Sequence, residues 1–67
     1  MEIEKQKLTL VQARKMAGFT QQQMADRLGV SKSTYRQYER HPGKMMIDKA
    51  WIFSGTVGVK LDDLLWK

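Results

Sequence analysis

Two helical patterns in this 67-residue chain are separated by only three residues, Gly29-Val30-Ser31. Glycine readily adopts the left-handed conformation that ends many helices, and serine is a favourable cap at the start of the next helix. A connection this short restricts the angle between the two helices that it joins. The sequence therefore predicts a helix pair in which one helix is held at a fixed, steep angle to the other.

Glycine and proline divide the rest of the chain into further short helical patterns. The expected helices cover residues 8–17, 20–28, 32–40, 47–56 and 61–66. No alternating strand pattern of useful length is present. We therefore expect an all-α fold: one compact five-helix domain over residues 1–67, whose second and third helices form the pair. Residues 1–7 are expected to be either a flexible arm or an extra helical turn.

Two of the predicted helices begin with a capping-box pattern, in which Thr is followed three residues later by Gln. The pairs are Thr9 with Gln12 and Thr20 with Gln23. In such a box, each side chain accepts a hydrogen bond from a backbone N–H group at the helix start. The pattern therefore marks where the first and second helices begin.

The charge of the chain favours a polyanionic partner. Twelve Lys and Arg residues against seven Asp and Glu residues leave a net charge of +5, which suits nucleic acid or an acidic membrane surface. A solvated basic face would explain the composition equally well. Membrane binding is disfavoured because the basic third helix lacks a broad apolar face and no apolar run approaches the ~18 residues of a membrane span.

The chain has few of the residues that metal centres and enzymes require. It has no cysteine and a single histidine, His41, so a disulfide framework and a thiolate metal site are excluded. No nucleophile–base pair or carboxylate dyad is recognisable. We therefore expect no enzymatic activity, metal, cofactor or small-molecule ligand. The acidic start MEIEKQK differs from a signal peptide, which favours a soluble, cytoplasmic protein.

The third predicted helix has two chemically distinct sides. At about 100° per residue, Tyr35 and Tyr38 fall together on one side. The opposite side carries Lys32, Ser33, Arg36, Gln37 and Arg40. Arg and Lys can donate to guanine N7 and O6, and Gln can pair with adenine N6 and N7. An ordinary surface helix could carry the same residues. The tyrosines could stack on bases, but their inward spacing favours core packing.

The pattern as a whole matches a known arrangement. The segment GFTQQQMADRLGVSKSTYRQYE resembles the core motif of the lambda repressor/Cro-type (XRE) helix-turn-helix family. The preceding ARKMAG resembles the end of the first helix of that family, and VGVKLDDLL resembles the end of its domain. The resemblance covers roughly Leu8 to Leu65. It implies that the third helix enters the major groove of DNA while the second lies across the backbone.

The resemblance also assigns roles to individual residues. The residues expected to read base edges are Lys32, Ser33, Arg36 and Gln37, and those expected to contact phosphates are Gln21, Gln22, Ser31, Arg40 and Lys44. Arg14 and Glu39 are expected to form an ion pair between the first and third helices, with a role in positioning rather than in stability. The simpler alternatives are an exposed glutamine at Gln21, a capping role alone for Ser31, and two independent surface charges at Arg14 and Glu39.

The chain departs from the family pattern after the third helix. Arg40-His41-Pro42-Gly43 makes this loop one residue longer than usual, and Pro42 has no N–H group to offer a phosphate. Lys60 stands where a Ser or Thr cap is common, so the fifth helix is expected to fray. The backbone contacts of residues 41–46 are therefore left open.

Taken together, these features predict a small phage or bacterial transcriptional regulator of the repressor/Cro kind. It would bind double-stranded DNA as a homodimer on an inverted repeat, with Trp66, Leu65 and Trp51 as the candidate dimer surface. The alternative is an antitoxin-like or co-regulator module that uses the same fold to bind a protein. The polar outer side of the third helix favours DNA, and the two tryptophans keep the alternative open.

Overall fold

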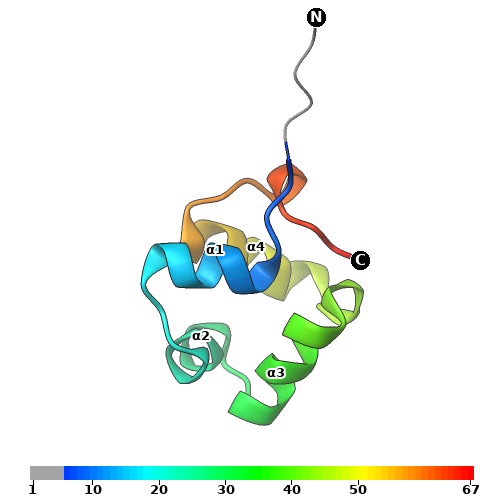
Figure 1. Cartoon of the computed structure of the whole chain (residues 1–67). Coiled ribbons are helices and arrows are strands. Elements are labelled where there is room, and N and C mark those ends of the chain that lie inside the picture. The colour runs from blue at the N-terminus through cyan, green and yellow to red at the C-terminus, as the bar shows by residue number, and fades with distance from the viewer. Residues whose placement is uncertain (1–5) are drawn as a thin grey trace, which may run out of the picture.

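The computed structural model describes residues 6–67 as four α-helices and two short 3-10 turns (Figure 1). The helices are α1 (Leu10–Ala17), α2 (Gln21–Leu28), α3 (Lys32–Arg40) and α4 (Ile47–Val57). The 3-10 turns are η1 (Pro42–Lys44) and η2 (Leu61–Asp63). The all-α prediction is confirmed for this part of the chain. Most of the predicted N-terminal arm, residues 1–5, lies outside the described residues.

The first three helices begin where their capping residues predict. Thr9 and Thr20 each form the complete capping box, with Gln12 and Gln23 as the partners. Ser31 caps α3 by accepting a hydrogen bond of 3.1 Å from the Thr34 N–H. By contrast, α4 begins without a side-chain cap.

The core gathers side chains from every helix. The largest fully buried side chains are Leu10, Met24, Leu28, Tyr35, Phe53 and Leu64. Tyr35 therefore points inward, as its spacing predicts, and Tyr38 is partly buried against the same core. Because Leu64 belongs to this set, the C-terminal segment is part of the core.

The predicted fifth helix is not present. Residues 61–63 make one 3-10 turn, and the chain then extends so that Leu64 pairs with Leu8 in an isolated parallel bridge. The Leu8 N–H donates to the Asp63 carbonyl at 2.9 Å, and the Leu65 N–H donates to the Leu8 carbonyl at 2.7 Å. Lys60 gives η2 no side-chain cap. The uncapped start and the pairing with Leu8 together explain why no α-helix continues to Trp66.

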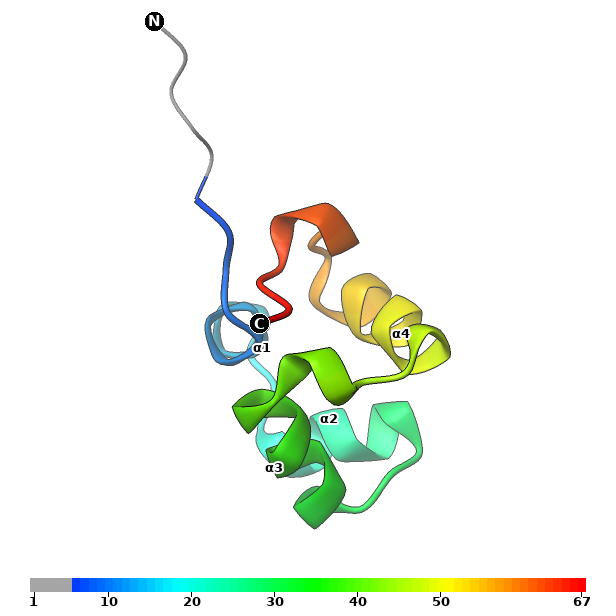
Figure 2. The same cartoon turned by 90° about the vertical axis from the view of Figure 1, so that its right-hand side faces the viewer.

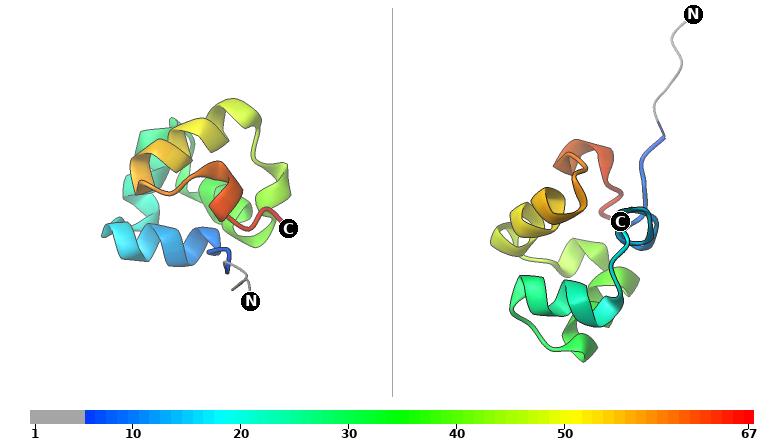
Figure 3. Two further views of the ribbon diagram at one scale, coloured as in Figure 1. Left: turned by 90° about the horizontal axis from the view of Figure 1, so that it is seen from above. Right: turned by 90° about the vertical axis from the view of Figure 1, so that its left-hand side faces the viewer.

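The helix pair lies at one end of the molecule. Figures 1 and 2 show α2 and α3 together at the end opposite η2, with α1 and α4 between. Figure 3 shows α4 running over α2, and α4 contacts α1, α2 and η2. The rest of the domain therefore supports α2 and α3 from one side and leaves the outer side of α3 open.

Candidate nucleic-acid interface

The turn between α2 and α3 is fixed by its backbone. Gly29 has a φ of 70°, the left-handed conformation that favours glycine. Its N–H donates to the Asp26 carbonyl, and the Val30 N–H donates to the Ala25 carbonyl at 3.0 Å. Val30 packs against the core. With Ser31 capping α3, the turn has little freedom, so α3 is held in one orientation against α2.

The outer side of α3 is exposed and polar. Ser33, Arg36, Gln37 and Arg40 line a shallow hollow of about 160 Å³, and Lys32 is exposed at the helix start. The structure thus brings together three of the four predicted base-reading residues. Arg40, predicted to contact phosphate, lies with them. Two guanidinium groups, an amide and a hydroxyl in one hollow are groups that can donate to base edges and phosphates.

The predicted phosphate-contacting residues of α2 already have partners within the protein. Gln21 Nε2 donates to Glu39 Oε1 at 2.8 Å, and Gln22 Nε2 donates to Asp26 Oδ1 at 2.9 Å. Gln21 is partly buried and Gln22 is exposed. Gln21 is therefore not the exposed, unattached glutamine of the simpler alternative.

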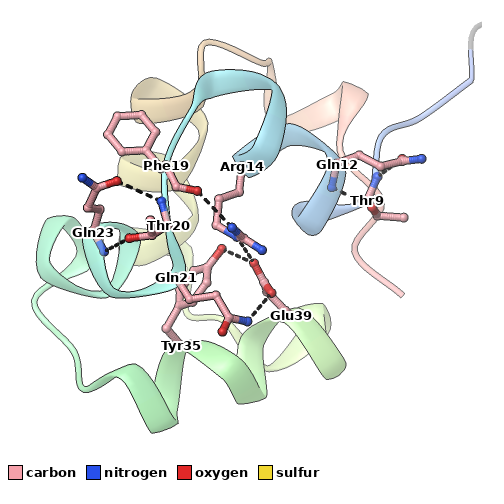
Figure 4. A network of polar contacts seen from close by, with 9 residues as sticks. All are labelled: Thr9, Gln12, Arg14, Phe19, Thr20, Gln21, Gln23, Tyr35 and Glu39. Atoms are coloured by element: carbon pink, nitrogen blue, oxygen red, sulfur yellow. Dashed lines mark hydrogen bonds and ion pairs between the residues drawn. The ribbon is translucent and has the colours of Figure 1, made fainter.

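The predicted ion pair between Arg14 and Glu39 is present and belongs to a larger network (Figure 4). Arg14 Nε donates to Glu39 Oε2 at 2.6 Å, and the Tyr35 hydroxyl donates to the same oxygen at 2.7 Å. Arg14 Nη1 also donates to the Phe19 carbonyl at 2.9 Å. One carboxylate thus links α1, α2 and α3.

The network keeps Glu39 ionised and Tyr35 protonated. Burial raises the pKa of Glu39. The hydrogen bonds from Arg14, Gln21 and Tyr35 and the charge of Arg14 lower it by more than burial raises it, so the pKa lies below its ordinary value. Burial, followed by the hydrogen bond to Glu39, strongly raises the pKa of Tyr35. The phenol therefore remains a donor and the carboxylate an acceptor.

Sequence reasoning missed two members of this network. Tyr35 and Glu39 stand four residues apart on one helix, a spacing that places side chains together and could have indicated their hydrogen bond. Gln21 is 18 positions from Glu39, and no local pattern relates them.

The loop between α3 and α4 uses backbone groups internally. The Lys44 N–H donates to the His41 carbonyl at 2.9 Å, and the Met45 N–H donates to the Pro42 carbonyl at 3.0 Å. Pro42 is buried, whereas the side chain of Lys44 is exposed. These two amides are therefore engaged in η1, whereas the exposed side chain of Lys44 is available to an anion.

The predicted dimer-surface residues differ in their surroundings. Trp51 is 64% exposed and Leu65 is 37% exposed. Trp66 instead packs against the core, and its Nε1 donates to the Leu61 carbonyl at 2.9 Å. Trp66 also lines a hollow of about 330 Å³ with Met45 and other residues. Met46 and Ile47, which the sequence analysis left out of this set, are also exposed, at 69% and 67%.

Other classes of site are not seen in residues 6–67. No cluster of three or more His, Cys, Asp or Glu residues there could hold a metal ion. Within the same described range, every helix is too short or too polar to cross a membrane.

A family model described as helix-turn-helix (HTH_3) matches residues 10–64, from the start of α1 to the buried Leu64. The chain belongs to the lambda repressor/Cro-type helix-turn-helix family. Searches of curated proteins and of solved structures gave no match. Membership of this helix-turn-helix family makes the chain a DNA-binding transcription regulator in general terms.

Proposed function

We propose that this helix-turn-helix protein is a sequence-specific operator-binding regulator of the repressor/Cro kind, which inserts α3 into the major groove. The observation that carries the proposal is the polar hollow on the outer side of α3, lined by Ser33, Arg36, Gln37 and Arg40. No apolar side chain lines it, and the buried Tyr35 anchors the opposite side of α3 in the core. Such a helix can meet base edges without losing its own packing.

Base reading and phosphate binding are divided between two sets of residues. Base edges are read by Lys32, Ser33, Arg36 and Gln37, and phosphates are contacted by Gln21, Gln22, Ser31, Arg40 and Lys44. Contacts of the first set select sequence, whereas those of the second set raise affinity for any sequence. The exposure of Lys44, the last residue of η1, supports its place in the second set.

The protein acts as a homodimer on an inverted repeat whose half-sites lie about one helical turn apart. The exposed apolar side chains of Trp51 and Leu65 support a surface between two copies. Ile47 stands four residues before Trp51 on α4, and Trp66 lines one hollow together with Ile47. Occupation of the repeat would block a promoter.

A second function is supported by the same exposed side chains. Met46, Ile47 and Trp51 expose about two-thirds of their surface, and exposed apolar side chains that form a patch mark protein interaction sites. An antitoxin-like or co-regulator module would bind its protein partner there. DNA binding and partner binding are compatible on separate surfaces.

The proposed function is tested by selection from a randomised duplex library at near-physiological salt. Enrichment of an inverted repeat is the expected result. Gln37→Ala should then relax selection at one base position, at a cost of roughly 1–3 kcal/mol. Gln6→Ala, at an exposed glutamine outside the helices, is the matched control. Recovery of no sequence preference would refute operator binding.

The phosphate set is tested by the salt dependence of binding to the enriched duplex. Lys44→Gln should reduce the slope of log affinity against log salt by about one unit, because one phosphate contact is lost. Lys60→Gln, an exposed lysine next to η2, should leave the slope unchanged. Equal slopes for both variants would remove Lys44 from the phosphate set.

A further inference from the structure

The side chain of Gln21 stands between the start of α2 and the carboxylate of Glu39. Gln21 is the first residue of α2, and its Nε2 donates to Glu39 Oε1 at 2.8 Å. Glu39 Oε2 accepts from Arg14 and Tyr35. Figure 4 shows the three donors converging on this carboxylate. Arg14 and Tyr35 therefore share Oε2, and Oε1 accepts from Gln21.

This contact fixes which way the amide of Gln21 faces. An ionised carboxylate only accepts hydrogen bonds, so the NH2 group of Gln21, and not its oxygen, must face Glu39. The terminal torsion of glutamine is broad and roughly two-fold, so without a partner the amide could turn over. One N–H group is bonded to Glu39, and the NH2 group carries a second. Glu39 thus selects the orientation that keeps a donor at this end of α2.

A carboxylate close to a phosphate contact would repel DNA unless its charge were compensated. Arg14 supplies that compensation: its side chain is 10% exposed and that of Glu39 is 7% exposed, with 2.6 Å between Nε and Oε2. Arg14 also donates to the Phe19 carbonyl, immediately before the capping box of α2. The ion pair therefore joins the start of α2 to α3 without presenting net negative charge.

We propose that Glu39 is a positioning residue for recognition of the DNA backbone. It holds the amide of Gln21 so that the second N–H donates to a phosphate oxygen while α3 is in the groove. This inference rests on the proposed function, since it assumes that Gln21 meets a phosphate. It assigns Glu39 a role in DNA affinity, in addition to its ion pair with Arg14.

The test is a double-mutant cycle in DNA affinity, measured by fluorescence anisotropy with the duplex enriched in the selection experiment. Gln21→Ala should weaken binding about tenfold, the change expected for losing one hydrogen bond to a charged group. Glu39→Gln should weaken it by a similar factor. The double variant Gln21→Ala/Glu39→Gln should bind as each single variant does, within about twofold. Losses that multiply, or no loss for Gln21→Ala, would overturn the proposal.

Tyr35→Phe is the matched control for a purely structural role. It removes a donor from Glu39 Oε2 and leaves the hydrogen bond between Oε1 and Gln21 in place. The thermal midpoint should fall, while the affinity for the duplex should change by less than about twofold. If Tyr35→Phe and Glu39→Gln each lost affinity in proportion to their loss of stability, Glu39 would act through folding alone.

A measurement on the unaltered protein keeps the proposal testable if Glu39→Gln does not fold. Nitrogen-15 relaxation should show the side-chain amide of Gln21 to be more ordered than that of the exposed Gln6, and duplex DNA should shift its resonances. Equal mobility of the two amides in the free protein would overturn the positioning role. Failure of the unaltered protein to bind any duplex would instead refute the proposed function, whatever the order of Gln21.

Discussion

The first part of the domain, helices α1, α2 and α3, is held in a different way from the second part, which follows it. Each of the three begins at a Thr or Ser whose side chain caps the helix, and the Glu39 carboxylate joins all three. The second part, α4 with η2, has no side-chain cap at either start. It is fixed by the packing of Phe53 and Leu64 and by backbone pairing with Leu8.

This difference separates two tasks. Apart from Lys44, the residues that we propose to face DNA stand on the first part, where polar contacts of defined geometry restrain the helices. The second part carries the most exposed apolar residues of α4, Ile47 and Trp51. A surface built on packing can accommodate a second copy or another protein, whereas base reading needs side chains held in register. The comparison predicts large effects for polar substitutions in the first part and small ones in the second.

The largest effect is expected for Arg14→Met. This change leaves the buried carboxylate of Glu39 without its cation, which costs about 3 kcal/mol in the free energy of unfolding. Urea denaturation followed by circular dichroism measures it. The control is Arg27→Met, which removes a guanidinium 5.2 Å from the Phe19 ring and should cost no more than about 1 kcal/mol. Equal losses of unfolding free energy in Arg14→Met and Arg27→Met would mean that the Glu39 network adds no special stability to the first part.

Acid should weaken the same network. The pKa of Glu39 is lowered on folding, so its stabilising contribution is complete above the unfolded pKa and is lost as pH falls through the folded pKa. The unfolding free energy of the unaltered protein should therefore fall more steeply below about pH 4.5 than that of Glu39→Gln. Urea midpoints at several pH values compare the two proteins. If the unfolding free energies of the two proteins fell in parallel with pH, Glu39 would not be the group responsible for the loss of stability in acid.

Removal of one cap should have an intermediate effect. Thr20→Ala removes the side chain that accepts from the Gln23 N–H at 3.1 Å and should cost about 1 kcal/mol. Thermal unfolding would report the loss as a lower midpoint. Thr56→Ala is the control, because Thr56 lies inside α4 and its hydroxyl donates to the Ile52 carbonyl instead of capping a helix start.

Adding a cap to α4 should reduce the difference between the two parts. Met46 precedes α4, is 69% exposed and has the extended backbone of an N-cap. Met46→Ser should therefore stabilise the protein by about 0.8 kcal/mol. Thermal unfolding of Met46→Ser is compared with that of Met16→Ser, because Met16 is also exposed but lies within α1. The comparison distinguishes the effect of a new cap from the effect of losing exposed apolar surface. A gain in both variants would argue against a capping effect.

The smallest effect is expected inside α4 at Gly55. A Cβ atom there would meet nothing within 4 Å, so Gly55→Ala should stabilise the protein by about 0.5 kcal/mol through a less flexible unfolded chain. Gly58→Ala is the matched contrast, because the φ of Gly58 is 71° and alanine would be strained there. A gain in Gly58→Ala would contradict the backbone argument.

The first part could be predicted from the sequence because its signals are local. Thr9, Thr20 and Ser31 mark the helix starts, and Gly18 and Gly29 mark two helix ends in the left-handed conformation. The inward direction of Tyr35 followed from spacing alone. The pair between Arg14 and Glu39 was predicted through the resemblance, because no local rule relates residues on α1 and α3.

The parts that could not be predicted depend on contacts between distant residues. The segment after Lys60 has the composition of a helix, but pairing with Leu8 draws it into an extended conformation. The inward packing of Trp66 follows from that path. The hydrogen bond from Gln21 to Glu39 likewise appears only when α2 and α3 are placed together. In each case the folded partner, and not the local sequence, decides the outcome.

The pairing of Leu8 with Leu64 also bears on the order of folding. The pairing joins positions near the two limits of the matched domain, so it closes a long loop. Closing that loop costs chain entropy, and the two backbone hydrogen bonds of the pairing offset this cost only after the helices have packed. Contacts between neighbouring helices, such as α2 with α3, close much shorter loops and form sooner. The amide protons of Leu8 and Leu65 should therefore exchange with solvent earlier than those in the middle of α2. We therefore expect the ends of the domain to open first, while α2 and α3, the helices proposed to meet DNA, stay folded.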